Sequence, residues 1–198
     1  MDTKALAISI ALAAVAMILN PAITGIRIPA PFLTGLYYQV WDIPIIVCFL
    51  LLGLRYGLLS SVLNGFFLLA VFPGPSQWLY APGNVAAEAS MMAGIWLARK
   101  LLARPNPAKL LETGKPTNRG KIVAASTISG ILVRIPVMLP IMFLILRFGY
   151  FAPDSYIIFL ALPIQAAYCV VMALYTIPVA YLIAIVVSKN LRVGNQVI

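Results

Sequence analysis

The chain has 198 residues, of which 63% are hydrophobic and only 10% are charged, whereas soluble domains are about a quarter charged. Such a chain cannot cover its surface with polar groups, and its long apolar runs lack the alternation that a β-barrel requires. The composition therefore excludes a soluble domain and predicts an all-α, polytopic membrane protein in a single transmembrane domain, residues 1–198.

Six transmembrane helices are expected, because about 20 apolar residues cross a bilayer and prolines, glycines and charges mark the breaks between such runs. In chain order they are residues 5–23, 43–54, 57–72, 84–102, 122–146 and 162–188. The second and third are short and tightly joined, which leaves room for tilt or an incomplete crossing. The polar segment 103–121 is expected to be a cytoplasmic linker, with partner docking as the alternative.

Lysine and arginine are distributed unevenly between the two sides of the membrane. With the N-terminus inside, all but three of the 14 fall on the inner side; Arg27 and Arg147 lie outside and Arg134 lies within the fifth helix. This excess predicts that both termini are cytoplasmic and that the chain is a multi-pass membrane protein, while a prokaryotic cell membrane is implied only by the resemblance described below. The net charge of +9 then lies next to anionic lipid, and it is poor evidence for nucleic acid.

Polar side chains inside the predicted helices are the candidate functional residues. An ionisable group within a membrane is costly and marks a function by default. Glu88 lies about one turn into the fourth helix and Arg134 lies near the middle of the fifth. We expect them to pair between neighbouring helices, either as a structural ion pair or in contact with a ligand.

The other candidates lie near the outer ends of the helices. Asp42 precedes Pro44, a combination that suits a helix start through the helix dipole and leaves a ligand role as the alternative. Gln165 and Tyr168 share one face of the sixth helix. Tyr38 and Trp41 belong to an aromatic outer loop, which is typical of a membrane-interface belt and also suits stacking on a flat ring.

Small residues on two predicted helices favour close helix packing. The alanines Ala7, Ala11 and Ala14 form a smooth stripe on the first helix, which packs either within the chain or on a partner subunit. Gly53 and Gly57 have the small-x-x-x-small spacing that lets helix backbones approach. The pattern does not decide between the two partners of the alanine stripe.

Several of these motifs, in this order, resemble the substrate-binding S components of energy-coupling-factor vitamin transporters, and the riboflavin-specific type most closely. Asp42-x-Pro44 is followed by an apolar run and Gly53-x-x-x-Gly57. Gly83-Asn84-Val85-Ala86 is similar to the family's opening of helix four, and Leu162-Pro163-Ile164-Gln165 is similar to its Leu-Pro-Phe-Asn. Ala7 and Ala11 match the Ala-x-x-x-Ala docking motif. The family's Gly-Pro turn has Leu54 instead, and its Lys-Asn of helix three is Asn64-Gly65.

The resemblance implies a binding protein that is not an enzyme and needs no cofactor or metal. It would capture riboflavin or another flat heteroaromatic micronutrient in an outward pocket formed by Tyr38, Trp41, Asp42, Asn84, Glu88, Arg134, Gln165 and Tyr168. The alanine stripe would dock on a transmembrane coupling subunit driven by two ATPase subunits, in agreement with the lack of a phosphate-binding loop here. The alternatives are a membrane enzyme acting on lipid or prenyl substrates, and a small scaffold or sensor.

Overall fold

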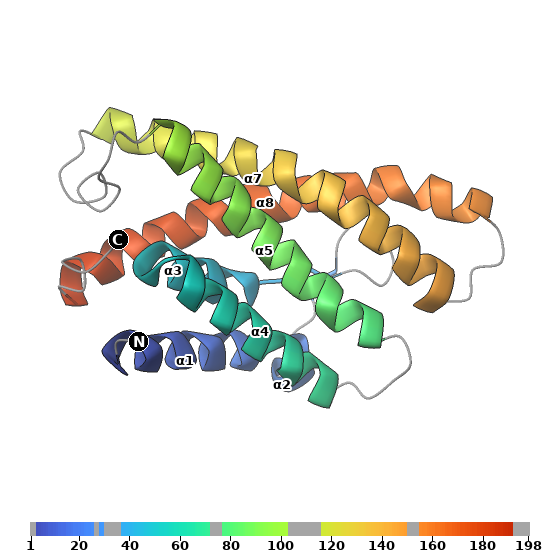
Figure 1. The fold of residues 1–198 in the computed structure, drawn as a ribbon, viewed down its shortest axis with the longest axis horizontal. Coiled ribbons are helices and arrows are strands. Elements are labelled where there is room, and N and C mark those ends of the chain that lie inside the picture. Colours follow the sequence, from blue (N-terminus) through green and yellow to red (C-terminus); the bar gives the residue numbers. More distant parts are fainter. Residues whose placement is uncertain are drawn as a thin grey trace.

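The computed structural model describes residues 3–25, 28–29, 37–71, 77–102, 116–149 and 155–191. This part of the chain is all-α, with an isolated bridge between Pro29 and Tyr37 and no strand. The helices are α1 (Thr3–Ile18), α2 (Pro21–Thr24), α3 (Asp42–Leu52), α4 (Leu54–Val71), α5 (Gln77–Leu102), α7 (Pro116–Leu144) with its π-helical extension η1 (Ile145–Gly149), and α8 (Ser155–Leu191). The long helices run back and forth between the two ends of an elongated bundle (Figure 1).

In the part of the chain that the structure describes, three helices are long and apolar enough to cross a membrane: α4, the part of α7 and η1 from Arg119 to Phe148, and α8 over Ala161–Ser188. The helices α1 and α3 are apolar but shorter, with 16 and 11 residues. The 26-residue α5 is not among the three, because Asn84, Glu88 and Ser90 interrupt its apolar sequence. The all-α membrane class is therefore supported, and the six-span topology stays a prediction.

Several helix ends differ from the prediction because prolines that we interpreted as breaks lie inside helices. Pro82 lies within α5, and Pro163 lies within α8. A proline removes one backbone hydrogen bond and kinks a helix, and neighbouring helices in a membrane bundle make this tolerable. The predicted linker is also shorter: residues 116–121 belong to α7, and residues 103–115 lie outside the described part of the chain.

The α3–α4 corner shows why two glycines follow the apolar run of α3. Gly53 has a φ of 91° and donates its N–H to the carbonyl oxygen of Phe49 at 2.9 Å. A Cβ on Gly57 would lie 2.6 Å from the Cβ of Phe49 and 2.8 Å from the Sδ of Met92. Gly53 therefore permits the turn, because residues with a Cβ disfavour positive φ, and Gly57 permits the close packing that the spacing predicted.

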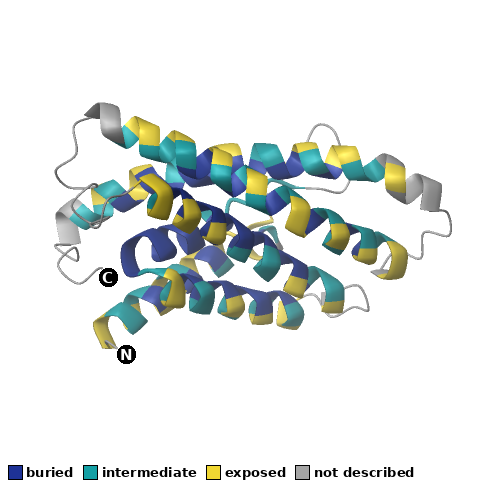
Figure 2. Ribbon diagram, turned by 45° about the horizontal axis from the view of Figure 1, so that its top comes forward, coloured by how far each residue is buried: buried dark blue, intermediate teal, exposed yellow. Residues whose placement is uncertain are grey.

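The core of the bundle is centred on α3. Every residue of this helix except Ile43 is buried, and α3 packs against α1, α4, α5 and α8. Figure 2 shows α3 in dark blue, with the exposed residues on the outer faces of the other helices. Large apolar side chains such as Phe66, Leu132 and Leu182 lie on that outer surface, as expected for helices that face lipid.

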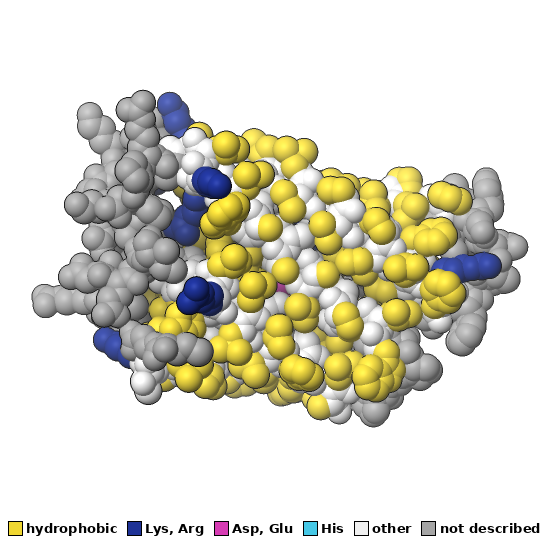
Figure 3. Space-filling view, in the orientation of Figure 1, with side chains coloured by type: hydrophobic (Ala, Val, Ile, Leu, Met, Phe, Trp, Pro, Cys, Tyr) yellow, Lys and Arg dark blue, Asp and Glu magenta, His cyan; other side chains and the backbone are white. Residues whose placement is uncertain are grey.

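Basic side chains gather at one end of the bundle. The start of α1 carries Lys4, the start of α4 carries Arg55, the end of α5 carries Arg99 and Lys100, and the start of α7 carries Arg119 and Lys121. Figure 3 shows Lys and Arg mainly at this end, with apolar side chains over most of the remaining face. At the opposite end η1 carries Arg147. This asymmetry is the one that the positive-inside rule describes.

Candidate functional site

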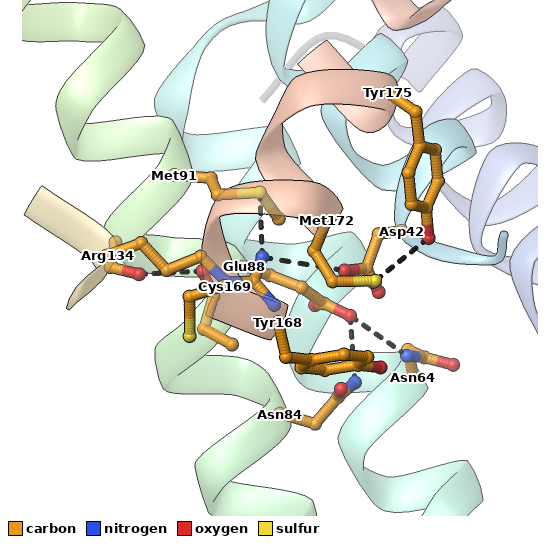
Figure 4. A network of polar contacts seen from close by, with 12 residues as sticks. Asp42, Asn64, Asn84, Glu88, Met91, Arg134, Tyr168, Cys169, Met172 and Tyr175 are labelled. Carbon is orange, nitrogen blue, oxygen red and sulfur yellow. Dashed lines mark hydrogen bonds and ion pairs between the residues drawn. The ribbon is translucent and has the colours of Figure 1, made fainter. Parts of the chain in front are cut away.

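Three charged side chains meet in the interior of the bundle. Asp42 comes from the first turn of α3, Glu88 from the first half of α5 and Arg134 from the middle of α7 (Figure 4). They are the only charged side chains among the described buried residues, with exposed fractions of 0%, 0% and 1%. The uncompensated burial of such groups is costly, so each must find a partner there or bind one.

Arg134 pairs with Asp42, and this corrects the predicted pair of Arg134 with Glu88. One guanidinium nitrogen, Nη1, lies 3.8 Å from Oδ2 of Asp42 and donates to Sδ of Met91 at 2.8 Å. Asp42 was expected at the membrane boundary as a helix-start residue. Because α3 is short and begins inside the bundle, its first turn instead places the carboxylate beside α5 and α7.

Glu88 is held by two asparagine side chains. Its Oε1 accepts a hydrogen bond from Nδ2 of Asn84 at 2.9 Å and from Nδ2 of Asn64 at 3.2 Å. Asn84 lies one turn earlier on α5, so the two side chains share a face. Asn64 lies on α4 and was not among the predicted site residues. The signal was present, since Asn64 is a buried polar residue in a largely apolar helix.

Tyrosines from α8 and from the segment before α3 enclose the cluster on another side. The hydroxyl of Tyr168 donates to the backbone oxygen of Tyr37. The ring of Tyr38 meets that of Tyr175 edge to face, with centroids 5.8 Å apart, and the hydroxyl of Tyr175 donates to Sδ of Met172 at 3.0 Å. These contacts hold residues 37–38 against α8. Tyr175 and Met172 were not predicted as site residues.

The remaining predicted residues, Gln165 and Trp41, are also buried. The amide nitrogen of Gln165 lies 4.0 Å from Sγ of Cys169, which itself lies beside the cluster in Figure 4. Trp41 packs into the large apolar core. The structure thus brings Asp42, Asn84, Glu88, Arg134 and Tyr168 to one place, with Gln165 linked through Cys169.

Many polar atoms in this cluster have no hydrogen-bond partner within the described chain. In native proteins the large majority of buried polar atoms are hydrogen-bonded, so a concentration of unpaired ones needs an explanation. The cluster atoms that lack a hydrogen bond include both carboxylate oxygens of Asp42, although Oδ2 faces Arg134 as an ion pair. The others include Oδ1 of Asn64, Oε2 of Glu88, Nε of Arg134, Oε1 of Gln165 and Oγ of Ser61, which lies beside Glu88. The bundle therefore offers more hydrogen-bonding capacity than its own side chains use.

The structure does not show the expected outward opening at the described residues of the predicted pocket. Trp41 is 8% exposed, Glu88 is 0% exposed and Gln165 is 4% exposed. A ligand could reach these buried side chains only after a rearrangement of the surrounding helices. The cluster is a candidate binding site whose named side chains are buried in this structure.

The alanine stripe of α1 faces away from the bundle. Ala7, Ala11 and Ala14 are all exposed, whereas Ser9, Ala13 and Ala16 face the other helices. Ser9 donates its hydroxyl to the backbone oxygen of Tyr56 at 3.1 Å. The three alanines therefore do not pack into the described bundle, and their docking on a partner subunit stays a prediction.

Comparisons with known proteins add no relative to these observations. No protein-family model matches the chain, and no curated protein or solved structure shows significant similarity to it. Among the described residues, no group of three or more His, Cys, Asp or Glu side chains is placed to hold a metal ion. The resemblance to vitamin-transporter S components therefore stays a prediction that depends on the motifs quoted above.

Proposed function

We propose that the chain is the membrane-embedded substrate-binding subunit of an energy-coupling-factor importer and captures a flat heteroaromatic vitamin from outside. The observation that carries this proposal is the convergence of polar side chains from α3, α4, α5, α7 and α8 in the middle of an otherwise apolar bundle. Binding sites for small molecules typically combine apolar walls with a few such convergent groups.

The composition of the site suits a small planar ligand. Tyr38, Tyr168 and Tyr175 supply rings on one side, and rings stack on or meet other rings edge to face. Asp42, Glu88 and Gln165 supply unpaired hydrogen-bonding atoms. A ring held in this way would be recognised by its edge groups and bound without chemical change.

The outward face of α1 would be the docking surface for the transmembrane coupling subunit, whose two ATPase partners would supply the energy. Alanine side chains at positions 7, 11 and 14 let another helix approach closely, because packing of small residues drives helix association in lipid. The exposure of all three keeps this face available to a second protein.

The test is a titration of the purified chain in nanodiscs against a panel of vitamins, followed by tryptophan fluorescence. We expect at least one flat heteroaromatic member to bind with micromolar or better affinity. Glu88→Gln should weaken that binding, while Ser126→Ala, a buried substitution on α7 away from the cluster, should leave it unchanged. The absence of a response to every member would contradict the proposal.

The same variants separate a binder from the two alternatives. A membrane enzyme acting on lipid or prenyl substrates would convert its ligand, so mass spectrometry of the ligand after incubation would show a new product. A scaffold or sensor in which the cluster is purely structural would bind no vitamin, and its variants would differ only in stability. Recovery of an unchanged vitamin from the complex would favour the proposed function over both.

A further inference from the structure

The polar cluster has an unequal balance of charge. Two carboxylates, Asp42 and Glu88, share the interior with one guanidinium, Arg134, and no other charged side chain is buried in the described chain. Arg134 lies against Asp42. The hydrogen bonds of Glu88 come from the neutral amides of Asn64 and Asn84. With all three groups ionised, the described interior carries one negative charge more than its buried side chains balance.

Among the cluster atoms without a hydrogen bond, acceptors outnumber donors, which matches the excess of negative charge. Those that can only accept a hydrogen bond are oxygens of Asp42, Asn64, Glu88 and Gln165, whereas the groups able to donate are fewer: Nε of Arg134 and the hydroxyl of Ser61, which lies beside Glu88. All six side chains are more than nine-tenths buried. Because acceptors outnumber donors, a ligand that satisfies the remaining oxygens would bring hydrogen-bond donors, since two acceptors cannot bond to each other.

From these two observations we propose that the ligand of this site is a small planar organic cation with N–H donors, which places its positive charge beside Glu88. This inference rests on the proposed binding function and narrows its substrate class. A buried charge is tolerated when an opposite charge and hydrogen bonds accompany it. A cation at this position would supply both to Oε2 of Glu88 and donors to the neighbouring oxygens. A neutral, acceptor-rich ring such as a flavin would leave the extra negative charge unbalanced.

The experiment divides the vitamin panel by charge. The cations are thiamine and pyridoxamine, the neutral members are riboflavin, pyridoxine and nicotinamide, and the anions are nicotinate and 4-pyridoxate. Pyridoxamine, pyridoxine and 4-pyridoxate share one ring and differ in a single substituent, so they form a matched set. Binding is measured on the full chain in nanodiscs, at fixed ionic strength, with sodium chloride alone as a further arm.

We expect the tightest ligand to be a cation. Glu88→Gln should reduce its affinity by about tenfold or more, since a charge-assisted hydrogen bond is lost. The variant retains Oε1 as acceptor for Asn64 and Asn84, so the fold should be preserved. If it fails to fold, Asp42→Asn removes the other carboxylate and should weaken the cation in the same way. Ser126→Ala is the control with no change expected.

Each other outcome overturns the inference in a distinct way. Tight binding of a neutral or anionic member, with cations bound weakly, would leave the proposed function standing and refute the charge argument. A response to sodium ions alone would identify an inorganic cation site instead. An affinity for the cation that is unchanged in both carboxylate variants would place the ligand elsewhere. No binding by any member would overturn the proposed function, and this inference with it.

Discussion

The ion pair between Arg134 and Asp42 can be tested by replacing Arg134 with methionine, which keeps an unbranched apolar chain and removes the charge. At 3.8 Å and an effective dielectric constant of about 20, the attraction between unit charges is about 4 kcal/mol. Removal of the Arg134 charge would leave the Asp42 carboxylate buried with neither an ion-pair partner nor a hydrogen bond. Removal of one partner from a buried pair typically costs about 3–5 kcal/mol. We expect a loss of unfolding free energy in this range.

The assay is equilibrium unfolding in mixed detergent micelles, with Arg134→Met measured in three backgrounds. In the otherwise unchanged chain, Arg134→Met should show the full loss of unfolding free energy. In the Asp42→Asn background the cost should fall to about 1–2 kcal/mol, because no buried carboxylate is left unpaired. In the Glu88→Gln background most of the cost should remain, since Glu88 is held by Asn64 and Asn84 instead.

The comparison of the two backgrounds decides between the observed pair and the pair expected from the sequence. If Glu88→Gln reduced the cost of Arg134→Met as much as Asp42→Asn, the guanidinium would interact with the total charge of the cluster and not with one partner. That result would refute the assignment of the ion pair. A cost below about 1 kcal/mol in the unchanged chain would refute it as well, because a surface pair is worth no more than that.

Three further predictions concern packing, hydrogen bonding and docking. Gly94→Ala should destabilise the chain by about 1–3 kcal/mol relative to Gly120→Ala in the same unfolding assay. A Cβ at Gly94 would lie 2.6 Å from backbone atoms of α7, whereas nothing lies within 4 Å of a Cβ at Gly120. Equal stability of the two variants would contradict this prediction. Tyr181→Phe should cost about 1 kcal/mol, because its hydroxyl lies 2.9 Å from Oγ of Ser126, and no cost in thermal unfolding would argue against the bond. Ala11→Leu should leave unfolding unchanged, because Ala11 is exposed, but should abolish co-purification with a coupling subunit; a loss of stability would show that α1 packs differently.

The sequence alone identified most of the cluster because the membrane makes polar residues conspicuous. Glu88, Arg134 and Gln165 stand out in apolar runs, and a charged or amide side chain there is costly unless it is used. All three are buried in the structure. Asn64 carried the same signal, but it was interpreted only as a departure from a family motif. Composition and spacing are thus sufficient to select residues that lie inside the bundle.

The partners within the cluster could not be predicted in the same way. Which side chains meet depends on the depth at which each helix begins and on its rotation about its axis. The sequence placed Asp42 at the membrane surface, whereas in the structure α3 is buried at every residue except Ile43 and Asp42 lies beside Arg134. Helix ends at Pro82 and Pro163 were misplaced for a related reason, since tertiary packing decides whether a proline ends a helix or only bends it.

The packing of α5 on α7 sets the position of Arg134. The two helices run in opposite directions, and Gly94 and Gly130 approach so closely that a Cβ on Gly94 would lie 2.6 Å from the Cα of Gly130. Met91 lies three residues before Gly94, and Arg134 lies four residues after Gly130, so both are about one turn from the contact on the same side. This spacing lets one guanidinium nitrogen contact Met91 and reach past it to Asp42 on α3. A separation of α5 and α7 by about 1 Å would forfeit much of that contact. The two glycines, which carry no chemistry themselves, therefore fix where the only buried positive charge of the described chain stands relative to both carboxylates.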